Sequence, residues 1–295
     1  MATVDAVLAL DMRADLLEGP VWDSRDACLY VVDIMAGRVH RFDPATNACT
    51  THDAHHTVDS VGAVALSDAG DLILATRDGF ARLNPTSGVL TTIADVEKDK
   101  PLQRMNDGKC DPAGRFWAGT MALDETPRAG SLYRLDPNGR VHVAVPGATI
   151  SNGIDWSDDA RTMFYIDSPT RRVDVFDFDL ESGCASNRRP FVHIPDQDGI
   201  PDGLTLDADG FLWVALWRGG AVRRYAPDGT LDAIVRVPTA CPTSCAFGGP
   251  DLRDLYVTTA RIELSERERA GQPLAGGLFV CRPGATGRLP NRFRG

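Results

Sequence analysis

The chain has 295 residues, of which 43% are hydrophobic and 24% are charged, and its formal net charge is −10 at pH 7. This composition is typical of a folded globular protein and argues against a disordered chain. The acidic balance, with both signs interspersed, disfavours nucleic acid and membranes as partners, and the apolar runs are too short to cross a bilayer.

The N-terminal segment is predicted to be a β-strand, Val4–Leu10, rather than a targeting sequence. It has neither a basic start nor a long apolar centre, so we do not expect a signal peptide. The seven cysteines include no CxxC pair of the metal-binding type. This usage favours reduced thiols and a cytoplasmic location.

A short pattern recurs six times along the chain, at intervals of about 42 to 50 residues, which indicates a repeat architecture. Each unit opens on a polar or small residue beside glycine, continues as an apolar stretch, turns at Asp and Gly, and returns as a second apolar stretch. The six openings are Glu18-Gly19-Pro20, Val61-Gly62-Ala63, Asn106-Asp107-Gly108, Asn152-Gly153-Ile154, Asp202-Gly203-Leu204 and Ser244-Cys245-Ala246.

Each unit is predicted to hold four short strands joined by tight turns. The fifth unit shows the pattern most clearly, with apolar stretches at Leu204–Leu206, Phe211–Leu216, Ala221–Tyr225 and Leu231–Val237. Four antiparallel strands in each of six units predict an all-β, six-bladed β-propeller. Two stacked sandwiches are the alternative, which the unbroken motif spacing and the absence of a linker disfavour.

The ring is predicted to close through its N-terminus. The last unit supplies two clear strands, Leu255–Thr258 and Gly277–Val280, and little beyond them. We therefore expect Val4–Leu10 to be the fourth strand of that blade, which also pairs exposed strand edges. The whole chain, 1–295, is then one propeller domain, with residues 284–295 predicted to be a flexible tail.

Four of the six openings carry a carboxylate or an amide at equivalent places, namely Glu18, Asn106, Asn152 and Asp202. In a ring of repeated units, equivalent positions surround one axis, so these side chains are expected to converge. Their oxygen atoms suit a hard divalent cation. Other Asp-Gly pairs are interpreted as turns: Asp107-Gly108, Asp209-Gly210 and Asp228-Gly229. Trp217 is expected to line the mouth of the pocket.

With these motifs in place, the chain resembles the regucalcin and gluconolactonase (senescence marker protein) family of sugar lactonases. The segments that carry the resemblance follow one another along nearly the whole chain. They are Glu18–Trp22, Asn106–Lys109, Asp111–Arg115, Ala118–Met121, Ser151–Ser157, Pro201–Gly203, Phe247–Gly249, Tyr256–Thr258 and Ala275–Gly277.

The resemblance implies a six-bladed propeller that holds one divalent metal ion. It implies that Glu18, Asn152 and Asp202 ligate the metal and that Asp202 also acts as the general base. Arg104 and Asn106 match substrate-holding positions. A third substrate position falls in the loop Ala122–Glu125, where Asp124 gives the best alignment.

The predicted function is metal-dependent hydrolysis of a sugar lactone, such as a glucono-, xylono- or arabinonolactone, to the aldonic acid. All-oxygen ligation favours Ca²⁺, Mg²⁺ or Mn²⁺, while Zn²⁺ and Fe²⁺ are also able to bind. Two alternatives stay open at this point: a phosphotriesterase-like hydrolase and a non-catalytic calcium-binding propeller. The expected partner is a small-molecule lactone, and the chain is expected to be a monomer or a weak oligomer.

Overall fold

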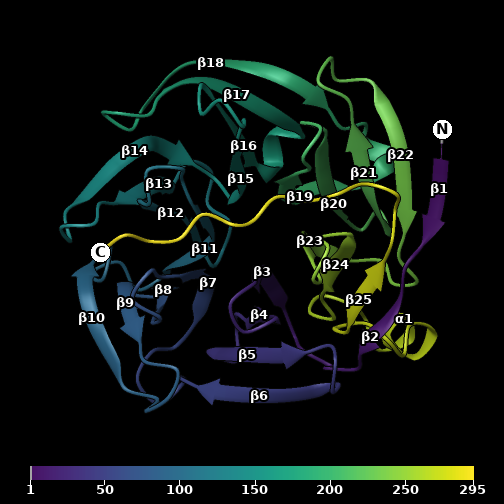
Figure 1. Ribbon diagram of the computed structural model, residues 1–295, viewed down its shortest axis with the longest axis horizontal. Coiled ribbons are helices and arrows are strands. Elements are labelled where there is room, and N and C mark those ends of the chain that lie inside the picture. Colours follow the sequence, from purple (N-terminus) through teal and green to yellow (C-terminus); the bar gives the residue numbers. More distant parts are fainter. Residues whose placement is uncertain (1) are drawn as a thin grey trace.

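The computed structural model describes residues 2–295 and shows six β-sheets arranged as blades around a central channel (Figure 1). Each blade is built from four antiparallel strands, which confirms the predicted all-β propeller. The sequence repeat therefore corresponds to one blade. Within residues 2–295, no helix has the length and apolar character needed to span a membrane.

The first three blades use consecutive strands in chain order. Blade one contains β3 (Leu17–Asp23), β4 (Cys28–Asp33), β5 (Arg38–Asp43) and β6 (Ala48–Asp53). Blade two contains β7 (Val61–Leu66), β8 (Leu72–Thr76), β9 (Gly79–Leu83) and β10 (Leu90–Asp95). Blade three contains β11 (Gln103–Cys110), β12 (Phe116–Ala122), β13 (Gly130–Leu135) and β14 (Val141–Ala148).

The remaining blades follow the same scheme, with short helices in their connections. Blade four contains β15 (Ser151–Trp156), β16 (Thr162–Asp167), the 3-10 turn η1 (Ser168–Thr170), β17 (Arg172–Asp179) and β18 (Cys184–His193). Blade five follows η2 (Asp196–Asp198) and contains β19 (Ile200–Leu206), β20 (Leu212–Trp217), β21 (Ala221–Tyr225) and β22 (Leu231–Arg236). Blade six contains β23 (Pro242–Gly248), β24 (Asp254–Thr259), α1 (Glu266–Gly271) and β25 (Leu278–Cys281).

The first strand of every blade lines the channel and lies beside the first strand of the next blade, so that β23 meets β3 and closes the ring. β7 is buried along its whole length, whereas β6 at the perimeter is almost entirely exposed. Burial on both faces explains why β7 reads as a continuous apolar run. The other inner strands carry buried polar side chains, among them Glu18, Asn106 and Asp202.

Every inner strand is irregular at the point where the sequence repeat opens. The register with the second strand of the blade shifts at Glu18/Val21, Val61/Ala63, Met105/Gly108, Ser151/Ile154, Pro201/Leu204 and Pro242/Ser244. A bulge turns a side chain away from the regular pleat. At Gly62 the bulge needs glycine because the neighbouring inner strand β11 approaches closely. A Cβ atom on Gly62 would lie 2.5 Å from the carbonyl oxygen of Asn106.

The N-terminus ties two blades together. β2 (Val7–Leu10) pairs antiparallel with β25, which confirms the predicted closure of blade six. The preceding strand, β1 (Ala2–Asp5), instead runs parallel to β22 and adds a fifth strand to blade five. The single strand predicted for Val4–Leu10 is thus divided at Ala6, whose amide nitrogen donates to the carbonyl of Arg236 at 2.9 Å.

Residues 284–295 lie across one end of the channel (Figure 1), which differs from the flexible tail that the sequence predicts. Phe293 is 2% exposed, and its amide nitrogen donates to the carbonyl of Leu66 in blade two at 2.8 Å. Arg294 reaches blade three through a 3.0 Å backbone hydrogen bond to Gly114. Arg288 and Arg292 of this segment bind carboxylates of the blades, so their charges do not mark a solvated tail.

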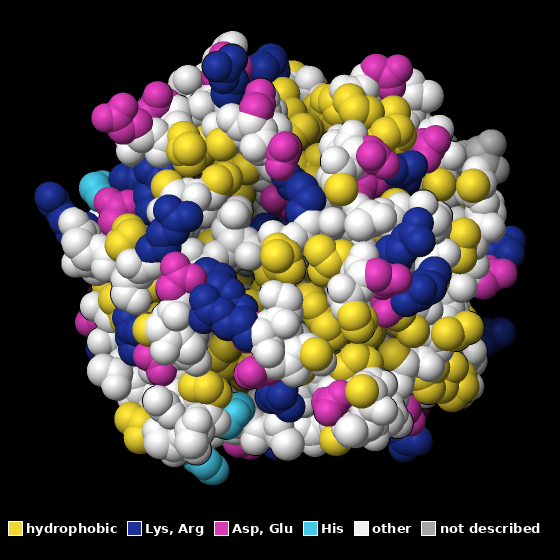
Figure 2. Space-filling model, in the orientation of Figure 1, with side chains coloured by type: hydrophobic (Ala, Val, Ile, Leu, Met, Phe, Trp, Pro, Cys, Tyr) yellow, Lys and Arg dark blue, Asp and Glu magenta, His cyan; other side chains and the backbone are white. Residues whose placement is uncertain are grey.

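The tail face carries charges of both signs, which Figure 2 shows interspersed over the surface. Beneath it, tryptophans recur at equivalent places in the blades and are buried there, namely Trp22, Trp117, Trp156 and Trp213. The indole nitrogens of Trp117 and Trp213 donate to the buried carboxylates of Asp111 and Asp207 at 2.8 and 3.0 Å. These contacts pair the buried polar atoms and help fix the blade interior.

Candidate active site

One end of the channel opens into a cavity of about 290 Å³ that holds the predicted site residues. We call it the upper cavity. The four polar residues of the repeat openings all line it, each from the inner strand of a different blade. They are Glu18 of β3, Asn106 of β11, Asn152 of β15 and Asp202 of β19. Arg104, also on β11, lines the same cavity. The inference that equivalent positions converge at the axis is therefore confirmed.

A chain of hydrogen bonds fixes the polar floor of this cavity. Arg104 Nη1 donates to Asn106 Oδ1 at 2.7 Å, and Asn106 Nδ2 donates to Asn152 Oδ1 at 3.2 Å. Asn152 Nδ2 in turn donates to the hydroxyl of Ser168 at 2.9 Å. Ser168 holds the amide nitrogen of Asn152, and Asn106 donates to its oxygen, which leaves one lone pair of that oxygen for a cation.

The carboxylates in the cavity are electrostatically uncompensated. Burial, together with repulsion from Asp202 and Asp107, raises the pKa of Glu18 well above its usual range. Burial and the charge of Asp107 likewise raise the pKa of Asp202, although Arg104 opposes this shift. Glu18 and Asp202 are 4% and 8% exposed, so water screens their repulsion poorly. Arg104 is the one positively charged side chain among the described residues that line this cavity.

Arg104 is the cation that faces these carboxylates. Burial lowers its pKa to about 10, against the opposing effect of Glu18, Asp202 and Glu125. It remains charged at neutral pH, and its buried Nε has no hydrogen-bond partner within the protein. A buried donor without a partner is costly, which suits a group that completes its bonding with a ligand.

The donor set of Glu18, Asn152 and Asp202 fits a divalent cation. It offers oxygen atoms alone, from three separate strands, and two of the three groups carry buried negative charges that repel each other. A cation would relieve that repulsion. Across residues 2–295, no cluster of three or more His, Cys, Asp or Glu side chains is suited to a metal. The donor set of Glu18, Asn152 and Asp202 is not a cluster of that kind, because one of its three members is the amide of Asn152.

The loop after β12 places its residues differently from the alignment. Asp124 is exposed and accepts hydrogen bonds from the backbone and hydroxyl of Thr126, at 3.1 and 2.8 Å, outside the residues that line the upper cavity. Glu125, the next residue, does line it. Three polar lining residues were not predicted as site residues, namely Glu125, Ser168 and Glu263. They lie in connections between strands, where the repeat gives no signal. Trp217 lines the cavity, as predicted.

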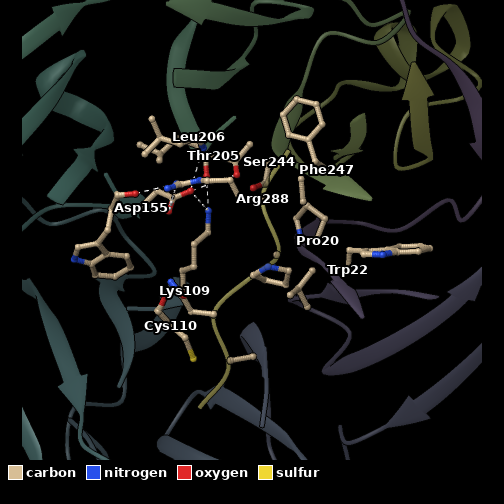
Figure 3. A pocket seen from close by; sticks show the side chains of 18 of the residues that line it. Pro20, Trp22, Lys109, Cys110, Asp155, Thr205, Leu206, Ser244, Phe247 and Arg288 are labelled. Atoms are coloured by element: carbon tan, nitrogen blue, oxygen red, sulfur yellow. Dashed lines mark hydrogen bonds and ion pairs between the residues drawn. The ribbon is translucent and has the colours of Figure 1, made fainter. Parts of the chain in front are cut away.

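A second cavity, of about 250 Å³, lies at the opposite end of the channel beneath the C-terminal tail (Figure 3). We call it the lower cavity. Lys109 Nζ binds Asp155 Oδ2 at 3.0 Å, and Arg288 of the tail binds Asp155 Oδ1 at 3.5 Å. The backbone nitrogen of Leu206 also donates to this carboxylate, at 3.0 Å. Burial would raise the pKa of Asp155, but Lys109 and Arg288 hold it below its usual range.

The structure corrects the interpretation of Asp107-Gly108 as a turn. Both residues belong to β11, and Asp107 is a buried residue of the channel that lines the lower cavity. Its charge contributes to the raised pKa values of Glu18 and Asp202. The bulge in β11, rather than a chain reversal, accommodates Gly108. Asp209-Gly210 and Asp228-Gly229 do lie in turns, as predicted.

Fold and site together define a six-bladed propeller whose channel end is an oxygen-rich, acidic pocket with one buried arginine. The chain belongs to the SMP-30/gluconolactonase/LRE-like family, whose model matches residues 16–261. Regucalcin of Xenopus laevis is 40% identical over 285 residues, which cover 94% of each chain. A Bacillus subtilis protein provisionally named sugar lactone lactonase YvrE is 38% identical over 293 residues, covering 99% of each chain.

A solved structure supports the same assignment. Regucalcin from Agrobacterium tumefaciens, described as a calcium-binding protein, superposes with a TM-score of 0.94 at 29% sequence identity. The match covers 100% of this chain and 99% of that one. The propeller and its full length are thus shared with a member of the family.

Proposed function

We propose that this protein is a lactonase that hydrolyses a sugar lactone to the open-chain aldonic acid with the help of one divalent cation in the upper cavity. The observation that carries the proposal is the convergence of two uncompensated carboxylates, an amide and a buried arginine. The family and the Bacillus relative support lactone hydrolysis as the reaction class. The calcium-binding neighbour supports a divalent ion.

The chain's own residues would divide the work as follows. Glu18, Asn152 and Asp202 would hold the cation, which when bound supplies Lewis-acid polarisation of the lactone carbonyl. Asp202 would take a proton from the attacking water through the carboxylate oxygen that remains free, and would return it to the departing ring oxygen.

Arg104 and Asn106 are proposed to hold the substrate. Arg104 would use its unpartnered Nε to bind oxygen atoms of the lactone, since its planar fork presents donors in a fixed geometry. Both amide hydrogens of Asn106 are occupied by Ser151 and Asn152. Asn106 would therefore contribute mainly through its carbonyl oxygen and by orienting Arg104 and Asn152. The role predicted for Asp124 stays a prediction, and Glu125 is the nearer carboxylate.

The same site is consistent with two other activities that the experiment must separate. A cation held there would also polarise a P=O bond, as a phosphotriesterase requires. A non-catalytic calcium site is the other interpretation, and the neighbour described as calcium-binding favours it.

We also propose a reducing, cytoplasmic compartment for this protein. Its seven cysteines are all free, which supports this location.

The test is turnover of a panel of aldonolactones and one organophosphate triester, followed with a pH indicator before and after chelation. We expect acid release from at least one lactone, its loss on chelation, and its recovery with one of Ca²⁺, Mg²⁺, Mn²⁺, Zn²⁺ or Fe²⁺. Faster turnover of the triester would favour the phosphotriesterase. Cation binding without any turnover would favour the non-catalytic site.

A further inference from the structure

The upper cavity has an apolar rim above its polar floor. Eight large apolar side chains line the cavity together with the site residues. They are Leu16, Met35, Met121, Leu123, Ile150, Ile200, Trp217 and Ile262. We call them the apolar rim. They come from connections and strand ends rather than from the middle of inner strands, and the repeat motif does not include them.

Topology places the rim around the channel mouth. The second strand of each blade runs antiparallel to the first, so its end lies at the same face as the start of the inner strand. Met35 follows β4, Leu123 follows β12, and Trp217 ends β20. Ile150 directly precedes β15, and Ile200 begins β19. The rim is therefore contributed by several blades and surrounds the entrance to the floor.

Parts of this rim are unusually exposed. Met35 is 38% exposed and Leu123 is 49% exposed, although most large apolar side chains of the chain are buried. Single exposed apolar residues are common on protein surfaces. Several that line one cavity around convergent polar groups are instead typical of a ligand pocket, in which apolar walls hold the part of the ligand that does not react.

The charge of the cavity is the second observation. Four carboxylates line it, at Glu18, Glu125, Asp202 and Glu263, and Arg104 is the one guanidinium among its described lining residues. A divalent cation on the floor would still leave the cavity acidic. An anionic substituent on the substrate would therefore be repelled by Glu125 and Glu263, which line the cavity together with the apolar rim.

We propose that the substrate is a neutral lactone that presents hydroxyl groups to the floor and an apolar group to the rim, as a deoxysugar lactone or an alkyl-substituted lactone does. This inference rests on the proposed lactonase function and adds the class of lactone. The apolar group would displace water from the apolar rim, and its burial would increase kcat/KM. Phosphorylated and carboxylated lactones would be poor substrates.

The first test is a series of γ-lactones with hydrogen, methyl, propyl or pentyl on the ring carbon that bears the ring oxygen. Burial of a methylene group is worth about 0.8 kcal/mol, which corresponds to an increase in kcat/KM of about threefold to fourfold for each methylene that the rim covers. We expect this rise in the wild type and a flatter series in Met35→Gln and Leu123→Gln. Val143→Gln is the matched control, because Val143 is 57% exposed on β14 at the perimeter. It should keep the wild-type slope.

The second test compares gluconolactone with the same lactone carrying a 6-phosphate. We expect kcat/KM for the phosphorylated lactone to be at least about tenfold lower, and Glu263→Gln to narrow the difference. A flat or falling alkyl series, or equal use of the phosphorylated lactone, overturns the inference while turnover of neutral aldonolactones leaves the lactonase function intact. Absence of turnover with every lactone overturns both.

Discussion

Two sets of buried carboxylates at the two ends of the channel, Glu18 with Asp202 and Asp155, are in opposite electrostatic states. In the upper cavity, burial and neighbouring carboxylates raise the pKa values of Glu18 and Asp202. In the lower cavity, Lys109 and Arg288 bind Asp155 and lower its pKa despite its burial. The cavities are similar in volume, about 290 and 250 Å³, so size does not distinguish them.

This difference shows which end is arranged for ligand binding. In the lower network, the carboxylate of Asp155 already has two cationic partners and a backbone donor. The upper cavity has an excess of negative charge, because four carboxylates and one guanidinium line it. Unsatisfied charge of this kind is costly to keep buried and concentrates at functional sites. We therefore assign the upper cavity to chemistry and the lower one to holding the blades and tail together.

Replacement of one aspartate at each end should give opposite phenotypes. At the lower end, Asp155→Asn leaves Lys109 and Arg288 without their carboxylate, so the free energy of unfolding should fall by about 3–5 kcal/mol while lactone turnover persists below the melting temperature. At the upper end, Asp202→Asn should lower kcat by about a hundredfold or more, since a general base is lost. Chemical denaturation and steady-state rates measure both. A rate loss confined to Asp155→Asn would reverse our assignment of the two ends.

Removal of the cation should affect stability as well as activity. A ligand that binds only the folded state at a hundred times its Kd stabilises that state by about 2.7 kcal/mol. We expect chelation to abolish turnover and to lower the melting temperature, and readdition of the cation to restore both. Asp155→Asn serves as the control. Its melting temperature should be lower than that of the wild type before chelation and should fall by the same amount on chelation. An unchanged melting temperature on chelation would contradict a tightly held ion.

The metal-free protein should be stabilised by neutralising the upper end. Folding raises the pKa of Glu18, so ionisation of this carboxyl group destabilises the folded state. The loss of stability begins as the pH rises above the pKa of glutamate in the unfolded chain, about 4.3. Glu18→Gln should then increase the free energy of unfolding of chelated protein at pH 7 by on the order of 1 kcal/mol, while weakening cation binding.

The lower end has the reverse pH dependence. The lowered pKa of Asp155 gives stability that is present above its unfolded value of about 3.9 and is lost as the pH falls through its folded value. Chelated Glu18→Gln should thus keep its acid denaturation but show a smaller decrease in stability toward neutral pH, since Asp202 still contributes to that decrease. Denaturation curves at pH 3, 5 and 7 measure this, and a destabilised chelated Glu18→Gln would contradict the repulsion at the upper end.

The smallest effect concerns the thiols, which the sequence predicts to be reduced. Cys49 and Cys184 are exposed, whereas the other five cysteines are buried, and burial raises the pKa of Cys28 to about 11. Titration of native protein with a thiol reagent should label two groups rapidly and the rest only on unfolding. Rapid labelling of more than two would show that the blades open readily.

The sequence was sufficient to predict the blades and the convergence of the floor residues, because both follow from the repeat. Glu18, Asn152 and Asp202 occupy equivalent positions, and a closed ring of repeats brings such positions together. The same repeat misled at Asp107-Gly108, where a bulged strand and a turn share one dipeptide. Local sequence does not distinguish these, since the close approach of Gly108 to Trp117 and Ala118 of β12 decides between them.

Features outside the repeat were not predictable for a different reason. Glu125 lines the cavity instead of Asp124 because the loop after β12 turns the aspartate toward Thr126. The lower network joins Lys109, Asp155 and Arg288, the last of which lies 133 residues from Asp155 in the chain. Contacts of this kind depend on where a loop or terminus crosses the surface, and periodicity carries no information about that.

The most direct test of the difference between the two ends is anomalous diffraction from crystals soaked in Mn²⁺. The account predicts one strong peak per chain in the upper cavity, within bonding distance of oxygens of Glu18, Asn152 and Asp202, and its loss in Asp202→Asn. A peak beside Asp155 in the lower cavity, or an upper cavity that stays empty in saturating Mn²⁺, would contradict it.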